Sequence, residues 1–210
     1  LLEEKIKLER FNGLVLCGGF SYGDVLGAGG GWSASILNNP ILYDGFAEFF
    51  ADPNKFALGV CNGCQAMSEL RSIIPGSDNW PRFLQNQSEQ FEGRLIMTKI
   101  KKSNSILFNG MDGQVLPIVV SHGEGRACYQ DDQTINITMT YVDDNYNDTN
   151  QYPYNPNGSM NAIAGLSNLD GRINIMMPHP ERSFLKAQLS WSPDSWDRYT
   201  PWLKIFENCR

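Results

Sequence analysis

The pentapeptide GVCNG at residues 59–63 places a cysteine between two glycines, in the spacing G-x-C-x-G. The cysteine directly follows the short apolar run 56–60. It precedes a stretch with helical spacing of apolar residues. Glycines at these positions allow the sharp strand-to-helix turn from which a nucleophile projects. The amides and the dipole of the following helix favour a thiolate, the reactive form of cysteine. The pattern therefore predicts Cys61 as a nucleophile, with the Asn62 amide as one donor to a reaction oxyanion.

Two other interpretations of Cys61 stay open from the residues alone. Most cysteines are small buried hydrophobes without a chemical role, and the elbow pattern by itself leaves that equally open. Cys61 and Cys64 also form C-x-x-C, which occurs in redox and zinc sites. The sequence has no second pair of this kind, and only His122 and His179 could complete a tetrahedral set. We therefore expect no metal.

The chain has two histidines, so the choice of a general base is narrow. His179 lies in the segment MPHPER at 177–182, directly after a strand-like run. Two prolines are expected to hold this segment extended, so that His179 and Glu181 point the same way. A carboxylate beside an imidazole fixes its tautomer and stabilises the imidazolium. The pattern suggests His179 as base and Glu181 as the acid that orients it. Taken alone, the pattern fits a rigid turn with an exposed Glu181–Arg182 ion pair better.

His122, in the segment SHGEGR at 121–126, is a rival base. Glycines on both sides of Glu124 would hold that acid poorly, so we rank His122 below His179.

The polar stretch 86–94 is either a solvated loop, which the sequence favours, or a source of polar groups for a small zwitterionic ligand. The glycines after the apolar run 13–17 could supply a second oxyanion donor, because their backbone can approach closely.

These residues need a sheet to position them. With 210 residues we expect one domain, an α/β fold with an early parallel part and later strands of uncertain pairing. Segments 18–31 and 143–161 are expected to be irregular loops. Apolar runs predict strands at 13–17, 56–60, 94–100, 115–121, 135–142 and 172–177, and helical spacing predicts helices at 32–37, 41–50, 62–73 and 199–208.

The composition excludes several classes of function. A formal net charge of −6 and the lack of a basic run argue against nucleic acid or a membrane surface as partner. No apolar stretch approaches the roughly 20 residues that span a bilayer, and residues 1–10 lack the apolar part of a signal peptide. Five cysteines without regular spacing do not form the pattern of a disulfide framework. We therefore expect a soluble protein of the cytoplasm.

Several segments, in this order and spacing, resemble the glutaminase domain of the large, single-chain phosphoribosylformylglycinamidine synthases. The similarity covers nearly the whole chain, which makes it far more specific than GVCNG alone. The segments are CGGFSYGDVLGAGGGW (17–32), ALGVCNGCQ (57–65), WPRFLQNQSEQFEGR (80–94), LFNGMDGQVLPIVVSHGEGR (107–126), YPYNPNGS (152–159), MMPHPER (176–182) and SWSPDSWDRYTPWLKIFENCR (190–210).

The resemblance implies a class I glutamine amidotransferase fold, a flavodoxin-like α/β sheet with helices on both faces. By motif, Cys61 is the nucleophile, His179 the general base and then acid, and Glu181 the acid that orients it. The resemblance also implies an oxyanion hole and a residue that binds the glutamine substrate. These roles fall on the amides of Gly19 and Asn62 and on the side chain of Gln65, four residues after the nucleophile.

The implied reaction is part of an ATP-dependent ligase of purine biosynthesis. This domain would release ammonia from L-glutamine and pass it to a synthetase domain of the same enzyme, which makes formylglycinamidine ribonucleotide. No cofactor is implied here, because ATP and Mg²⁺ belong to the synthetase. Other class I glutaminases, and a non-catalytic remnant, are the alternatives. Residues 1–210 would be one glutaminase domain, a C-terminal fragment of a larger synthase that lacks the first βα unit, so that the strand at 14–17 has no neighbour on one side.

Overall fold

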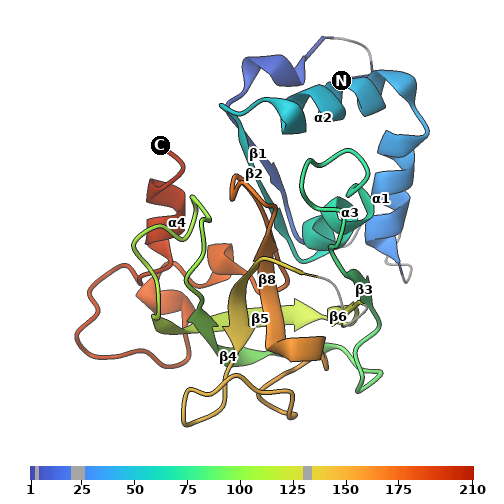
Figure 1. The fold of residues 1–210 in the computed structure, drawn as a ribbon. Coiled ribbons are helices and arrows are strands. Elements are labelled where there is room, and N and C mark those ends of the chain that lie inside the picture. Colours follow the sequence, from blue (N-terminus) through green and yellow to red (C-terminus); the bar gives the residue numbers. More distant parts are fainter. Residues whose placement is uncertain (3–4, 20–26, 130–133) are drawn as a thin grey trace.

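The computed structural model describes residues 1–2, 5–19, 27–129 and 134–210. Within these residues the chain forms a seven-stranded sheet of order β1-β2-β9-β8-β7-β4-β5 and a two-stranded sheet of β3 and β6 (Figure 1). The strands are β1 (Gly13–Leu16), β2 (Phe56–Val60), β3 (Arg82–Leu84), β4 (Glu92–Ile100), β5 (Val115–His122), β6 (Arg126–Cys128), β7 (Ile137–Tyr141), β8 (Ile163–Ser167) and β9 (Ile173–Met176).

The large sheet is mixed, and its parallel part carries the predicted chemistry. Strands β1, β2 and β9 run parallel, with Leu16 opposite Gly59 and Gly59 opposite Ile175. Each further strand, from β8 to β5, runs antiparallel to its neighbour. The carboxyl ends of β1, β2 and β9 therefore meet at one edge, which is where α/β sheets place ligands.

The helices divide into two groups. Figure 1 shows α1, α2 and α3 gathered beside β1 and β2, whereas α4 lies apart from them. The indole of Trp202, next to α4, donates to the carbonyl of Pro117 in β5 at 2.7 Å. The α-helices are α1 (Ala28–Leu37), α2 (Pro40–Ala51), α3 (Asn62–Glu69) and α4 (Leu203–Glu207), and the 3₁₀ turns are η1 (Leu8–Arg10), η2 (Met160–Ala162), η3 (Pro180–Arg182) and η4 (Lys186–Gln188).

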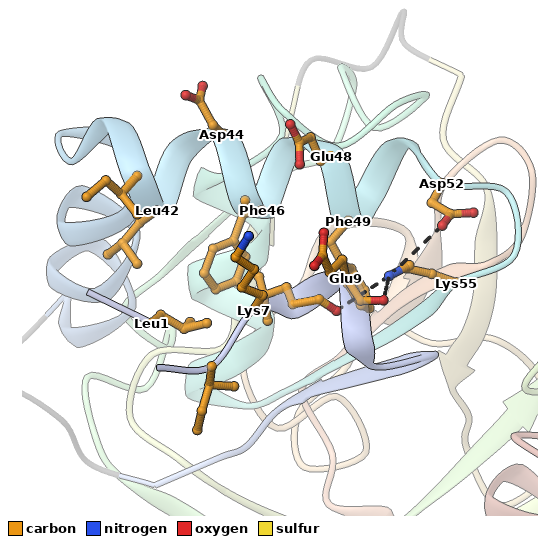
Figure 2. A pocket seen from close by; sticks show the side chains of 14 residues that line it. Leu1, Lys7, Glu9, Leu42, Asp44, Phe46, Glu48, Phe49, Asp52 and Lys55 are labelled. Carbon is orange, nitrogen blue, oxygen red and sulfur yellow. Dashed lines mark hydrogen bonds and ion pairs between the residues drawn. The ribbon is translucent and has the colours of Figure 1, made fainter. Parts of the chain in front are cut away.

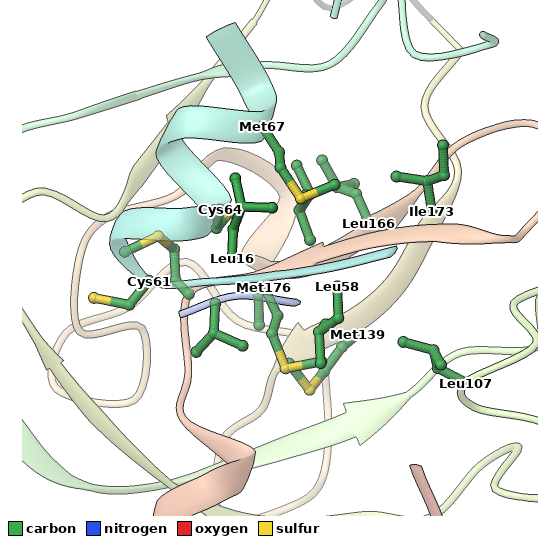
Figure 3. Packing of buried hydrophobic residues seen from close by; sticks show 14 of the residues in the cluster. Leu16, Leu58, Cys61, Cys64, Met67, Leu107, Met139, Leu166, Ile173 and Met176 are labelled. Atoms are coloured by element: carbon green, nitrogen blue, oxygen red, sulfur yellow. The ribbon is translucent and has the colours of Figure 1, made fainter. Parts of the chain in front are cut away.

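The hydrophobic core includes α3 and both faces of the central strands. Strand β2 is buried along almost its whole length, as its unbroken apolar sequence indicates for a strand covered on both faces. Met67 of α3 lies beside Leu166 of β8, whereas Met176 of β9 lies with Leu58 and Met139 on the other side of the strands (Figure 3). Burial of each such side chain contributes about 1.5–3 kcal/mol. The core therefore fixes α3, and with it the residues that precede the helix.

The predicted α/β fold class is confirmed, as are the six predicted strands to within a few residues. Helix α2 matches its prediction because Asn39 caps it, accepting from the Leu42 amide at 3.2 Å, and because Phe46, Phe49 and Phe50 form its buried face. The sequence analysis did not anticipate β3, β6 or β8. The first two are only three residues long, and hydrophobic alternation is not readable at that length.

Two helices are shorter than predicted. Helix α3 ends at Glu69 and is followed by turns, in which the Ser77 hydroxyl donates to the carbonyls of Arg71 and Ile74. Helix α4 begins only at Leu203, since Tyr199 pairs with Leu185 and Pro201 and Trp202 form a turn.

Helix α1 corrects the expectation that the glycine-rich segment up to residue 31 is irregular. The helix starts at Ala28, so residues 28–31 belong to its first turn. A Cβ on Gly29 would lie 2.5 Å from the Gln65 Cβ of α3. Close packing against α3 outweighs the poor helix propensity of glycine. Residues 20–26 of the predicted loop lie outside the described residues.

The polar segment 143–161 is mostly irregular, as expected, but part of it is buried. Asn155 accepts from the amides of Gly158 and Ser159 at 2.9 and 3.2 Å, and its own amide donates to the Ser159 carbonyl. Asn157 is fully buried. Residues 155–159 therefore form part of the interior, whereas residues 144–148 and 150–153 are exposed.

Strand β1 is an edge of the large sheet as far as the described residues extend, and it pairs there with β2 alone. The Val15 side chain in its middle is 53% exposed. In the same parts of the chain, no helix has both the length and the apolar character to cross a membrane.

The close approach of α3 to β1 leads to a stability prediction. A Cβ on Gly63 would lie 1.9 Å from the carbonyl oxygen of Leu16, a backbone atom that cannot move alone. We expect Gly63→Ala to lower the free energy of unfolding by about 3 kcal/mol or more, measured by urea denaturation.

Gly45→Ala is the matched control, because a Cβ there meets nothing within 4 Å and the site lies inside α2. We expect it to stabilise the fold by about 0.5–1 kcal/mol. Equal unfolding midpoints for the two variants would contradict this account of the α3–β1 contact.

Candidate active site

Cys61 occupies a strained position between β2 and α3. Its backbone has φ 52° and ψ −108°, a conformation that residues with a side chain rarely adopt. Its amide donates to the carbonyl of Met176 at 2.9 Å, which ties the turn to the end of β9. The Cys61 sulfur lies 3.7 Å from the Ser121 carbonyl oxygen at the end of β5, within reach of a weak thiol hydrogen bond. The predicted sharp turn between a strand and a helix is therefore present at Cys61.

The two glycines of G-x-C-x-G are required by close contacts. A Cβ on Gly59 would lie 2.7 Å from both the Gly63 carbonyl oxygen and the Met67 sulfur. Gly63 itself lies against the backbone of Leu16. Any larger residue at either position would push α3 away from the sheet, and the turn at Cys61 would open.

His179 and Cys61 meet at the end of β1. A Cβ built on Gly18 would lie 2.7 Å from His179 Cε1 and 3.1 Å from Cys61 Cβ, so both side chains lie over this glycine. Both residues are buried. The structure thus brings together two residues that are 118 positions apart, at the edge where the parallel strands end.

Glu181 contacts His179 as the sequence suggested, but through a different backbone. The segment is not extended throughout: Pro180 starts the 3₁₀ turn η3, which contains Glu181. Glu181 Oε1 lies 2.6 Å from His179 Nδ1. Arg182 Nε lies 3.6 Å from the same oxygen, so the alternative ion pair coexists with the histidine contact.

The backbone of His179 is held by a residue that the sequence analysis missed. Its amide donates to the Val119 carbonyl at 2.8 Å. The buried hydroxyl of Ser183 donates to the His179 carbonyl at 3.0 Å and accepts from the Val119 amide at 3.1 Å. A serine four residues after a histidine carries no distinctive signal, because its partner on β5 is distant in sequence.

The charges around His179 favour its protonated form. Burial alone would lower the pKa of His179, but attraction to the Cys61 sulfur and the Glu181 carboxylate raises it to about 9. Burial opposes the charged form of Glu181 too, yet its hydrogen bond to His179 lowers the pKa of the carboxyl. The pair is therefore an imidazolium and a carboxylate at neutral pH.

His122 lies in the opposite electrostatic environment. Burial, together with the charges of His179 and Arg94, lowers the pKa of His122 to about 3. Its Nε2 lies 3.2 Å from the amide nitrogen of Asn157, and the carboxylate of nearby Glu124 turns elsewhere. His122 is thus a neutral, structural imidazole here, which favours His179 as the base.

Gln65, Asn62 and Gly19 lie around the elbow, where the resemblance assigned them. Asn62 is the first residue of α3 and is buried. Gly19 is exposed just beyond β1, with φ 122°. The side-chain amide of Gln65, on the next turn of α3, donates to the Glu124 carbonyl oxygen. Their roles in the oxyanion hole and in glutamine binding stay predictions.

The polar stretch 86–94 is mostly exposed, as the sequence favoured, but it contains two buried residues, Asn86 and Glu92. Asn86 is buried, donates to the His122 carbonyl at 2.8 Å and accepts from the Gly125 amide at 2.9 Å. It therefore fixes the loop that follows β5, beside Cys61. An asparagine can satisfy a carbonyl and an amide at once, but sequence spacing does not reveal such a distant pair.

Comparison with known proteins places the chain in a family. A family model described as the CobB/CobQ-like glutamine amidotransferase domain matches residues 1–210. The chain belongs to this family. The structure titled PurLQS from Thermotoga maritima is similar over 98% of this chain and 81% of its own, with 25% identity and a TM-score of 0.71. A putative GMP synthase protein from Thermoplasma acidophilum, at 14% identity, covers 96% and 72% with a TM-score of 0.52, a likeness of fold alone. The resemblance found in the sequence is thereby confirmed.

The cysteines of this glutamine amidotransferase domain are all free. Burial raises the pKa of the Cys64 thiol well above its usual value, with a further contribution from Cys61. In the parts of the chain that the structure describes, no group of three or more His, Cys, Asp or Glu side chains is placed to hold a metal ion. Cys64 is therefore a buried, protonated neighbour of Cys61.

The amidotransferase domain also has a cavity of about 450 Å³ far from the elbow, between α2 and the N-terminal segment (Figure 2). Phe46 and Phe49 contribute apolar walls, and Asp44 and Glu48 are among its acidic lining residues. Lys55 closes one end by donating to the Glu9 carbonyl at 2.8 Å. None of the residues assigned to the reaction lines it.

The two histidines should titrate at widely separated pH values. We expect histidine NMR to show one imidazole that titrates near pH 9 and another that stays neutral down to about pH 3. Glu181→Gln should lower the pKa of His179, because it removes the negative charge at 2.6 Å. His122→Asn assigns the signals. Two titrations near 6.5 would contradict the electrostatic assignment.

Proposed function

We propose that this domain hydrolyses L-glutamine to glutamate and ammonia, with Cys61, His179 and Glu181 as a catalytic triad. The observation that carries the proposal is the strained elbow at Cys61 beside the His179–Glu181 pair. Membership in the glutamine amidotransferase family supports the substrate. A nucleophile, a base and an orienting acid are the parts that amide hydrolysis through a covalent intermediate requires.

In the first step, the Cys61 thiolate attacks the carbonyl carbon of the glutamine side chain. The carbonyl π electrons move to oxygen, and the amides of Gly19 and Asn62 stabilise the resulting oxyanion. As the tetrahedral intermediate collapses, the C–N bond breaks and His179 donates a proton to the departing nitrogen. Ammonia leaves, and a thioester joins Cys61 to the glutamyl group.

In the second step, water attacks the thioester while neutral His179 accepts a proton from it. The C–S bond breaks, glutamate leaves, and the proton on His179 restores the ion pair with the thiolate. The high pKa of His179 suits its role as an acid in the first step, and Glu181 stabilises the imidazolium throughout.

We further propose that the ammonia passes to an ATP-dependent synthetase that makes formylglycinamidine ribonucleotide. The sequence segments shared with those synthases and the similarity to PurLQS support this partner. ATP and Mg²⁺ would bind to the synthetase. Cys61 is only 8% exposed, so ammonia would form in a buried place, where protonation by bulk water is limited.

Covalent labelling tests the nucleophile. We expect a glutamine-like diazo ketone to modify Cys61 in the full-length protein, as mapped by mass spectrometry. Cys61→Ala should abolish glutamine hydrolysis, while product formation from added ammonium continues, because the synthetase reaction needs only ammonia. Cys64→Ala is the control: its thiol is buried and protonated, so most activity should remain.

Modification of Cys64 instead, or an active Cys61→Ala protein, would disprove the triad. Glutamine hydrolysis coupled to another acceptor would leave the triad in place and replace the synthetase.

The two histidines and Glu181 should differ in their effects on the rate of glutamate release. His179→Ala should reduce kcat by about 10²–10⁴-fold, because general acid–base help is lost. Glu181→Ala should cost less, since it only orients and stabilises the imidazole. His122→Ala should also cost less than His179→Ala. A larger loss for His122→Ala would make His122 the base.

A further inference from the structure

Glu124, between β5 and β6, caps a helix that is distant in sequence. Both carboxylate oxygens accept from the Gly27 amide, at 2.9 and 2.8 Å, across 97 residues of chain. Gly27 is the N-cap of α1 and has no side chain with which to cap the helix itself. The carboxylate therefore satisfies the amide of the N-cap residue, as the acid of a capping box does, and faces the positive end of the helix.

The backbone of the same residue faces α3. The carbonyl oxygen of Glu124 accepts from the side-chain amide of Gln65. Gly29 of α1 lies against the other side of Gln65, at a distance that leaves no room for a Cβ. Gln65 is consequently packed between the first turn of α1 and the carbonyl of Glu124, one helical turn after Cys61.

Other residues hold this loop without help from the Glu124 carboxylate. Asn86 binds the His122 carbonyl and the Gly125 amide, and the Ser159 hydroxyl donates to the Gly125 carbonyl at 3.2 Å. Removal of the carboxylate is therefore expected to release α1 and loosen Gln65, while the rest of the loop keeps its place.

We propose that Glu124 is a positioning residue for glutamine binding. Its carboxylate fixes the start of α1 and its carbonyl fixes the Gln65 side chain, so that Gln65 is already oriented when glutamine arrives. The inference rests on the proposed function, in which Gln65 contacts the substrate. Glu124 acts through Gly27 and Gln65 rather than on the reacting atoms, so its loss should change KM more than kcat.

The test compares Glu124→Ala and Glu124→Gln in the full-length protein, with Glu48→Ala as a matched control on the exposed face of α2. Glu124→Ala should raise KM for glutamine about three- to tenfold, the effect expected from loss of a helix cap, with kcat nearly unchanged. Glu124→Gln keeps an acceptor for Gly27 and should raise KM less. Hydrogen exchange measured by mass spectrometry should become faster in the first turn of α1 in Glu124→Ala and, to a smaller extent, in Glu124→Gln.

An unchanged KM in Glu124→Ala, or a fall in kcat alone, would overturn the proposal while glutamine hydrolysis by the natural protein stands. If Glu124→Ala does not fold, Glu124→Gln decides: a KM equal to that of the natural protein, with α1 exchange also unchanged, overturns it. Absence of glutamine hydrolysis in the natural protein would disprove the proposed function instead. In that case unchanged exchange in α1 of Glu124→Ala would refute the positioning role as well.

Discussion

The contact between the start of α3 and the backbone of β1 is the constraint on which the active site depends. Gly63 lies so close to the carbonyl of Leu16 that no side chain fits between them. Because the helix begins this near the sheet, the chain must turn within one residue, and that residue is Cys61, at φ 52°. Buried packing of α3 over the strands holds the strained turn in place.

The same edge of the sheet gives its two histidines opposite character. Both are buried, and burial by itself disfavours a charged imidazole. His179 faces a thiol and a carboxylate, which more than offset the cost of burial, whereas His122 faces an amide and like charges, which add to it. One histidine is thus suited to move protons and the other to act as a neutral hydrogen-bonding group.

A framework of side-chain hydrogen bonds to backbone atoms surrounds these residues. Ser183 links His179 to β5, Asn86 holds the loop after β5, and Glu124 joins that loop to α1. Irregular backbone carries polar groups that must be satisfied when buried, and regular strand pairing cannot supply the partners here. The loops beside Cys61 are consequently fixed in position although they lack regular structure.

The sequence by itself determined the parts of this protein that rest on short-range patterns. Unbroken apolar runs identified the central strands, GVCNG identified the elbow, and the spacing of His179 and Glu181 identified their pair, because these features lie within a few residues. The tertiary structure alone decided that α1 begins among glycines, that Asn86 is buried, and that His122 pairs with Asn157 rather than Glu124. Those outcomes depend on contacts between distant segments, which no local pattern encodes. His122 and Asn157 are 35 residues apart, and Gly27 and Glu124 are 97 residues apart.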